Sequence, residues 1–331
     1  MKKAIYRRTG AAHDVLEIVE SAVPEPGPGE VRVRVAWSGV NPSDTKSRAG
    51  VRSNRMPFPE VTPHSDGAGI VDAVGEGVEP ARIGQRVWLW NAAWGRADGT
   101  AAEFVVLPQH QAVPLPGPVP LEAGACLGIP AMTAAHAVLG YGGVAGQRVL
   151  VAGGAGAVGH YAIQMARLAG AAQVIATVSS DEKAAIALEA GADAAVDYRA
   201  ADFIERVNAL TGGQGVDRII EVDLAANARA DFDLLAPGGL AVVYGSGQPE
   251  ASVPFVPGIL KNLQLAFFIV YHLAPPARAL AQSQLTAWLA EGRLQHRIAA
   301  RLGLARVADA HVLVESGRMI GNVVLSIGGE A

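Results

Sequence analysis

Seven residues near the middle of the chain have the types and spacing needed to bind a dinucleotide. They contain the pattern Gly-x-Gly-x-x-Gly at Gly154, Gly156 and Gly159. In such a loop the first glycine permits a tight turn, the second lets the backbone approach a pyrophosphate, and the third lets a helix pack on a sheet, with the helix N-terminus facing the anion. We therefore predict that the cofactor contacts the whole loop, whose residues are Gly153, Gly154, Ala155, Gly156, Ala157, Val158 and Gly159.

A chain with 39 glycines produces such patterns by chance, so the elements around this one decide its meaning. The apolar run Val149–Ala152 predicts a strand directly before the loop, and apolar residues repeat at helical spacing from Val158 to Leu168. A strand, a glycine loop and a helix in this order are the context that a dinucleotide site requires. The alternative is a structural glycine turn in a sheet that binds no nucleotide.

The end of the next predicted strand indicates which dinucleotide binds. NAD sites place an acidic residue there, about 20 residues beyond the first glycine, to hold the ribose 2′-hydroxyl. This chain has Val178 at that place, followed by Ser179 and Lys183. Hydroxyl groups and a cation favour the 2′-phosphate of NADPH, so NADP is the predicted cofactor. The alternative is that Ser179 and Glu182 form a helix capping box and that Lys183 is a solvated helix residue.

The elements that must position this loop divide the chain into two kinds of architecture. Short alternating runs such as Val31–Val35 and Ile70–Val74 predict a turn-rich β-barrel in the first third, and the proline-dense stretch Pro108–Pro120 predicts a linker or a domain boundary. Five strand–helix repeats follow between Val149 and Tyr244, which is typical of a doubly wound parallel sheet. The predicted fold class is therefore α/β.

The composition excludes several classes of protein. Half of the 331 residues are hydrophobic and 18% are charged, which excludes a disordered chain. A net charge of −4 offers no basic surface to nucleic acid or to an anionic membrane. Cys126 is the only cysteine, which excludes a disulfide framework and a Cys-x-x-Cys zinc site. Because no apolar stretch follows the basic residues of Met1–Arg8, the expected location is the cytoplasm.

These motifs together resemble the medium-chain dehydrogenase/reductase superfamily, and most of all its zinc-independent zeta-crystallin-like NADPH:quinone oxidoreductases. Besides the Gly154 fingerprint, the resemblance rests on the segments Ser38–Pro42, His64–Val71, Gly75–Val78, Ile83–Val87 and Gly321–Leu325. It covers nearly the whole chain in the family's order. It implies a GroES-like catalytic domain over residues 1–120, a Rossmann NADP-binding domain over 121–265, and a return to the catalytic domain over 266–331.

The same resemblance allows us to test, residue by residue, whether the chain is a zinc-dependent alcohol dehydrogenase. Their catalytic ligands would fall at Ser38, Ser65 and near Ile129, and their structural zinc lobe needs four closely spaced cysteines. Hydroxyl and alkyl groups do not replace thiolate and imidazole as zinc ligands, so no metal site is predicted. The scattered histidines are expected to be surface or packing residues, among them His64, His110 and His136.

Without a metal, side chains must orient the substrate carbonyl and stabilise the negative charge that develops on its oxygen. The resemblance implies that Asn41 lies beside nicotinamide and substrate, although a residue before Pro42 is also typical of a turn. Lys46 and Arg52 stand where quinone reductases often have tyrosines, so they either form a positive pocket rim or are solvated. Thr133 matches a position near the nicotinamide. The predicted catalytic residues are Asn41, Lys46 and Thr133.

The resemblance also implies cofactor contacts outside the glycine loop. Tyr198 and Lys183 match positions that meet the 2′-phosphate in the family. Gly245, Ser246 and Phe268 match positions near the nicotinamide.

The predicted function is a zinc-independent, NADPH-dependent reductase that transfers hydride to a quinone or an α,β-unsaturated carbonyl. Two alternatives stay open: an enoyl- or acrylyl-thioester (CoA) reductase, and a non-catalytic NADPH-binding structural protein of the crystallin kind. The predicted partner is a small-molecule quinone or enone, and neither nucleic acid nor a membrane is expected. The apolar run Leu265–Val270 predicts a sheet edge that pairs with a second copy, so a homodimer is expected.

Overall fold

The computed structural model describes residues 1–51, 53 and 55–328. The chain forms two compact units, which we call unit 1 (Met1–Pro130 with Thr286–Ala331) and unit 2 (Ala131–Leu285). The functional domain limits expected near residues 120 and 265 stay a prediction. Among the described residues, no helix combines the length and the apolarity that crossing a membrane requires.

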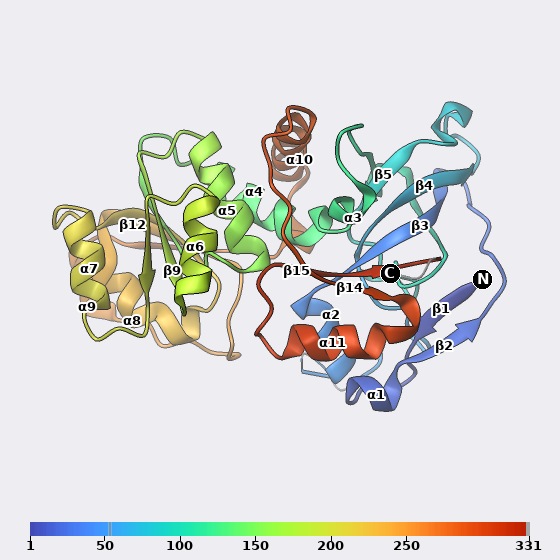
Figure 1. The fold of residues 1–331 in the computed structure, drawn as a ribbon, viewed down its shortest axis with the longest axis horizontal. Coiled ribbons are helices and arrows are strands. Elements are labelled where there is room, and N and C mark those ends of the chain that lie inside the picture. Colours follow the sequence, from blue (N-terminus) through green and yellow to red (C-terminus); the bar gives the residue numbers. More distant parts are fainter. Residues whose placement is uncertain (52, 54, 329–331) are drawn as a thin grey trace. The chain divides into compact units, whose positions relative to one another are not determined.

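Unit 1 is built on a seven-stranded sheet with the order β14-β15-β3-β4-β5-β7, in which β6 also pairs with β3 (Figure 1). β14 and β15 are parallel, and the other pairs are antiparallel. The strands of this sheet are β3 (Glu30–Val40), β4 (Asp66–Val74), β5 (Arg86–Leu89), β6 (Phe104–Pro108), β7 (Ala112–Pro114), β14 (Ile298–Gly303) and β15 (Asn322–Ser326). The remaining elements are the β1 (Lys2–Ile5) and β2 (Glu17–Glu20) pair, the helices α1 (Ala12–Val15), α2 (Pro42–Ala49), α3 (Leu121–Gly124) and α11 (Val307–Glu315), and the short turns η1 (Pro80–Arg82), η2 (Gln109–Gln111), η3 (Leu127–Ala131) and η5 (Leu304–Arg306).

Apolar and charged residues alternate along β3 because one face of the strand is buried, as the sequence predicts. Val31, Val33 and Val35 are buried in the core of unit 1, whereas Arg34 on the opposite face is exposed. The linker prediction for Pro108–Pro120 is wrong in part, because β7 lies inside it and pairs with β5. Pro108 and Pro114 are tolerated because each is the last residue of its strand.

Unit 2 is a six-stranded parallel sheet with the order β10-β9-β8-β11-β12-β13, covered by helices on both faces (Figure 1). Its strands are β8 (Arg148–Val151), β9 (Gln173–Val178), β10 (Ala194–Asp197), β11 (Val216–Glu221), β12 (Leu235–Val243) and β13 (Gln264–Phe267). Its helices are α4 (Met132–Leu139), α5 (Ala157–Leu168), α6 (Asp181–Glu189), α7 (Phe203–Leu210), α8 (Leu224–Leu234), α9 (Phe255–Leu260), η4 (Val270–His272) and α10 (Pro275–Ala290), the last of which ends in unit 1. The strand order reverses between β8 and β11, which confirms the predicted doubly wound sheet and places the crevice for a ligand at the carboxyl ends of these strands.

A buried arginine fixes the helix that carries Thr133. Arg218 points from β11 toward the C-terminal end of α4, and its side chain is 2% exposed. Its guanidinium donates hydrogen bonds to the carbonyl oxygens of Gly140, Tyr141 and Gly143 at 3.0–3.2 Å. A cation at a helix C-terminus satisfies carbonyl groups that the helix leaves unpaired.

Candidate functional site

The glycine loop joins β8 to α5 and folds tightly against the neighbouring strand. Gly153 has a φ of 66°, in the left-handed region that favours glycine. Its N–H donates to the Thr177 hydroxyl at 3.0 Å, and the N–H of Gly154 donates to the Thr177 carbonyl at 2.9 Å. The left-handed residue of the turn is therefore Gly153, whereas the sequence assigned the turn to Gly154.

Gly154 and Gly159 are required by close packing instead. A Cβ at Gly154 would lie 2.7 Å from the Cβ of Ala176, and one at Gly159 would overlap the carbonyl group of Gly153. Gly156 is the N-cap of α5, and a Cβ there would meet only the carbonyl oxygen of Gly153, at 3.2 Å. The helix thus begins against a loop without side chains, where its first N–H groups remain available to an anion. This cradle fits a pyrophosphate.

The end of β9 has the character that a 2′-phosphate requires. Val178 is buried, and Lys183 Nζ donates to the Ser179 hydroxyl at 2.9 Å. The N-cap of α6 is Ser180, whose hydroxyl accepts from the N–H of Lys183 at 3.3 Å. The alternative of a capping box at Ser179 is therefore wrong by one residue. The ammonium group of Lys183 folds back onto the strand end.

The neighbouring strand end adds two residues that sequence reasoning missed. Asp197 ends β10 and lies in register with Val178, and the N–H of Tyr198 donates to the Val178 carbonyl at 3.2 Å. Arg199 donates to both Asp197 oxygens, at 3.0 and 2.7 Å, and these bonds lower the pKa of Asp197 to about 2. The carboxylate beside the predicted phosphate position is therefore neutralised by an arginine. The Asp-x-Arg spacing after the strand was the available signal.

The residues predicted near the nicotinamide also follow strand ends of unit 2. Gly245 and Ser246 come after β12, and a Cβ at Gly245 would overlap the carbonyl oxygen of Val222. Phe268 comes after β13, where its N–H donates to the Val243 carbonyl at 3.1 Å. Because all six strands are parallel, these residues share one edge of the sheet with the glycine loop, Ser179 and Tyr198.

Thr133 lies in α4 and is buried. One helical turn further on, the His136 ring packs edge-on to Phe268 with ring centres 4.6 Å apart. Burial lowers the pKa of His136, which is consistent with the packing role expected for it. The structure thus places Phe268 beside the helix that carries Thr133, and the role of Thr133 stays a prediction.

In unit 1, the predicted catalytic Asn41 is held by its backbone and by its amide. It is the N-cap of α2 and 4% exposed, and its backbone N–H donates to Asp44 Oδ2 at 2.8 Å. Its side-chain Nδ2 donates to Asp66 Oδ2 at 2.9 Å. Asp66 is fully buried, which raises its pKa well above the usual range, and the bond from Asn41 partly opposes this. Asn41 is therefore a capping residue and also part of a buried polar pair.

Lys46, the third predicted catalytic residue, lies in α2 and is partly exposed. Arg52, considered with it as a positive rim, lies outside the described residues. Whether these two residues form a positive rim of the substrate pocket or are simply solvated stays a prediction.

A chain of four buried polar side chains lies beside Asp66, and sequence reasoning gave none of them a role in the site. The Ser38 hydroxyl is 2.9 Å from His64 Nδ1 and 2.8 Å from the Thr100 hydroxyl. His64 Nε2 is 2.9 Å from His311 Nε2, and the two rings are stacked. Thr100 also donates to the carbonyl oxygen of Asp66. No local pattern could have revealed this cluster, because its members come from four separate segments.

Comparison with known proteins identifies the family. Residues 27–117 match the alcohol dehydrogenase GroES-like domain, and residues 157–286 match the zinc-binding dehydrogenase family. The chain is 32% identical to quinone oxidoreductase of Rattus norvegicus over 308 residues, which are 92% of this chain and 91% of that protein. The chain belongs to the quinone oxidoreductase family of the medium-chain dehydrogenases/reductases. This confirms the resemblance found in the sequence.

Solved structures of relatives extend this likeness to the fold. An NAD-dependent alcohol dehydrogenase superposes with a TM-score of 0.90 at 32% identity, covering 99% of this chain and all of that one. The quinone oxidoreductase of Escherichia coli, solved in complex with NADPH, gives a TM-score of 0.87 at 26% identity, covering 98% of this chain and all of that one. The two-domain α/β architecture of the family is thus present here.

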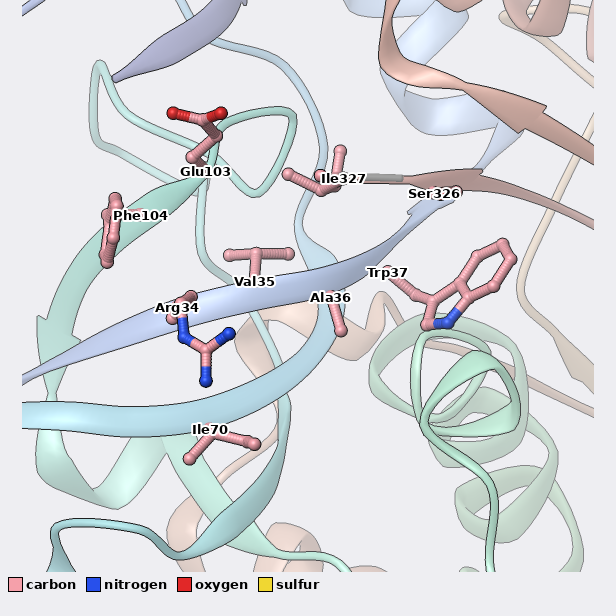
Figure 2. A pocket seen from close by; sticks show the side chains of 10 residues that line it. Arg34, Val35, Ala36, Trp37, Ile70, Glu103, Phe104, Ser326 and Ile327 are labelled. Carbon is pink, nitrogen blue, oxygen red and sulfur yellow. The ribbon is translucent and has the colours of Figure 1, made fainter. Parts of the chain in front are cut away.

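In this chain, a pocket of about 460 Å³ lies on unit 1, away from Asn41 and Lys46 (Figure 2). Arg34 and Trp37 of β3 line it together with Glu103 and Ile327. It contains none of the predicted site residues, so it is not the predicted substrate site.

Two buried carboxyl groups lie at the end of β11, next to the glycine loop. Glu221 ends β11 and Asp231 lies in α8; both are buried, and Glu221 Oε1 accepts from Asn227 Nδ2 at 2.9 Å. Burial and the neighbouring Glu221 charge raise the pKa of Asp231 to about 9. Burial opposes ionisation of both groups, so Asp231 keeps its proton at neutral pH.

Proposed function

We propose that this chain is an NADPH-dependent quinone oxidoreductase that works without zinc. NADPH, a quinone and a proton give NADP⁺ and the hydroquinone, and an α,β-unsaturated carbonyl is the other acceptor of the same class. Membership of the quinone oxidoreductase family supports the reaction. A thioester reductase and a non-catalytic structural protein are not favoured by the relatives.

The cofactor choice rests on the end of β9. The relatives divide on this point, since one is named NAD-dependent and another was solved with NADPH. In this chain Val178 occupies the place of the ribose-binding carboxylate. Beside it, Lys183 Nζ donates to the Ser179 hydroxyl at 2.9 Å. Asp197, the carboxylate in register with Val178, is paired with Arg199. This arrangement accepts a phosphate and places no carboxylate at the position of Val178.

Each predicted residue then has a physical task. NADPH supplies the hydride when bound. The glycine loop and the start of α5 hold its pyrophosphate, and Lys183, Ser179 and Tyr198 hold its 2′-phosphate. Thr133, Gly245, Ser246 and Phe268 surround the nicotinamide and exclude water. Asn41 donates its second amide hydrogen to the substrate oxygen, because the first is held by Asp66.

Zinc independence rests on the donor set. Ser65 is buried at a position where the zinc enzymes carry histidine, and Ile129 offers no donor. Among the residues that the structure describes, no three His, Cys, Asp or Glu side chains come together as a metal site. Activity is therefore expected to survive prolonged EDTA treatment, with well under about one zinc per chain by elemental analysis. Stoichiometric zinc that is lost together with activity would contradict this proposal.

The substrate class is tested by comparing two acceptors. NADPH oxidation should be faster with a simple quinone than with a short enoyl-CoA at equal concentration. The reverse order would make the chain a thioester reductase, and no turnover of either would favour a structural protein.

The oligomer proposed is a homodimer built on the edge of the unit 2 sheet. β13 is the last strand of that sheet, and Phe267 on it is 65% exposed. In the adjoining α9, Phe255 and Leu260 are 74% and 77% exposed. An unpaired edge flanked by large apolar side chains fits a second copy across a twofold axis. Light scattering should give twice the 34.1 kDa of one chain, and the monomer mass would reject the dimer.

The proposed location is the cytoplasm, where a buried free Cys126 stays reduced. The proposed partner is a small quinone or enone, and no nucleic acid or membrane.

A further inference from the structure

The buried chain of Ser38, His64, Thr100 and His311 has a single possible direction. Ser38, His64 and Thr100 are fully buried, and so is His311. A neutral imidazole has one donor nitrogen and one acceptor nitrogen, and a hydroxyl has one hydrogen to give. Each link therefore determines the next.

The direction is fixed first at the Thr100 end. Thr100 gives its hydroxyl hydrogen to the carbonyl oxygen of Asp66, because a carbonyl oxygen can only accept. Thr100 must then accept from Ser38, and Ser38 must accept from His64 Nδ1. This leaves His64 Nε2 as an acceptor, so His311 Nε2 carries the hydrogen between the two rings.

The opposite end of the chain is consistent with this direction. This direction leaves a lone pair on His311 Nδ1, which is buried and receives no hydrogen bond from the residues that the structure describes. The nearby charged group is Arg48, whose guanidinium is buried, pairs with Glu315, and depresses the pKa of His311 after burial itself. Burial lowers the pKa of both rings, and Arg48 lowers that of His311 further, so both rings are neutral.

The chain cannot carry protons to a substrate, because it ends on a backbone carbonyl. The hydrogen-bonded chain instead holds the His64 side chain and backbone in place. His64 has a φ of 78°, which is rare for a residue with a side chain, and hydrogen bonds at both ring nitrogens hold it there. The backbone of the same residue is tied to Thr100, whose N–H donates to the His64 carbonyl at 2.9 Å.

The carbonyl at the end of the chain belongs to Asp66, whose carboxyl group holds the amide of Asn41. We infer that His311 and His64, through Ser38 and Thr100, are positioning residues that fix Asp66 and thereby the orientation of the Asn41 amide. This inference rests on the proposed role of Asn41, but the direction of the chain does not.

The direction is tested by ¹⁵N NMR of the full-length protein labelled at histidine. Long-range proton–nitrogen correlations should show His64 protonated at Nδ1 and His311 protonated at Nε2. The His311→Gln variant assigns the His311 signals by their loss. The opposite pattern, or a doubly protonated ring at neutral pH, would overturn the inference.

The positioning role is tested with two matched pairs of variants. Thr100→Val has the same shape without the hydroxyl and should lower kcat about tenfold, whereas Thr100→Ser keeps the hydroxyl and should retain most of kcat. His311→Leu should lower kcat likewise, and His311→Gln, which keeps an N–H in place of Nε2, should restore it. In every folded variant the KM for NADPH should stay within about twofold, because unit 2 is unchanged.

If kcat is unchanged in both Thr100→Val and His311→Leu while Asn41→Ala is impaired, the positioning inference is wrong and the proposed function stands. If Asn41→Ala is also unimpaired, the proposed role of Asn41 fails instead. Should Thr100→Val not fold, the His311 pair decides the question alone.

Discussion

The predicted cofactor residues of unit 2 and the polar cluster of unit 1 are built in opposite ways. In unit 2 the residues follow the ends of parallel strands, and several act through glycine backbone or through exposed side chains such as Tyr198. In unit 1 the Asn41 amide is held by Asp66, beside a cluster of buried side chains that come from segments far apart.

The difference explains which parts a sequence can reveal. A loop that binds through its backbone needs small residues at fixed local spacing, and such spacing is visible in a sequence. A buried polar cluster needs only that every donor finds an acceptor, and the partners can be anywhere in the chain. His64 and His311, for example, are 247 positions apart.

The largest effect is expected from filling the glycine cradle. In Gly159→Ala the new Cβ would overlap the Gly153 carbonyl and lie 2.9 Å from the Cα of Gly154, so the loop and α5 must separate. NADPH affinity should fall more than about a hundredfold, with a loss of about 1–3 kcal/mol in the free energy of unfolding. Gly117→Ala is the control, because a Cβ there meets nothing within 4 Å. If titration shows that Gly159→Ala binds NADPH with unchanged affinity, the glycine loop does not bind the cofactor.

Removing the Asn41 amide should act on chemistry and not on the cofactor. Asn41→Ala is expected to lower kcat about ten- to a thousandfold, as for the loss of one donor to a developing oxyanion. The Kd for NADPH should change little, and Asn208→Ala in α7 serves as control. Steady-state kinetics with a quinone measure the split, and an unchanged kcat would reduce Asn41 to a helix cap.

Lys183→Ala should weaken NADPH about ten- to a hundredfold and leave NADH nearly unchanged, because one charge-assisted hydrogen bond is worth about 1.5–3 kcal/mol. Val178→Asp should shift preference toward NADH by adding a ribose acceptor and a repulsive charge. Lys2→Ala removes the same charge from unit 1 and should affect neither cofactor. Equal losses for NADPH and NADH in Lys183→Ala would show that Lys183 does not face the 2′-phosphate.

The smallest effect on cofactor binding and turnover is expected from the buried carboxyl pair near the glycine loop, whose effect is on stability. Burial raises the pKa of Asp231 from 3.8 to about 9, so the folded protein keeps a proton that the unfolded chain loses. The free energy of unfolding should therefore fall as the pH rises through this window, by up to about 1.4 kcal/mol per pH unit. Urea titrations at several pH values should show this slope in the unmodified protein and in Asp233→Asn, whose carboxylate is exposed, but not in Asp231→Asn. A slope that persists in Asp231→Asn would assign it to other groups.

The sequence predicts the unit 2 sheet, its glycine loop and the positions of Ser179, Lys183, Gly245 and Phe268, since each depends on local spacing or on family motifs. It missed Arg199, because an exposed arginine after a strand is common. It also misplaced the turn residue by one, since adjacent glycines look alike in a sequence and only φ separates Gly153 from Gly154. The polar chain beside Asp66 could not be predicted, because its hydrogen bonds exist only once β3, α11 and the segments around His64 and Thr100 have packed.

The central claim is that the chain reduces quinones with NADPH, selected by Lys183 and Ser179 at the end of β9. The most direct test is the ratio of kcat/KM for NADPH to that for NADH in the unmodified, EDTA-treated protein with a quinone as acceptor. We expect NADPH to be preferred by about tenfold or more. A ratio that favours NADH would contradict it and would show that Asp181, Glu182 or Asp197 faces the adenosine ribose in place of Lys183.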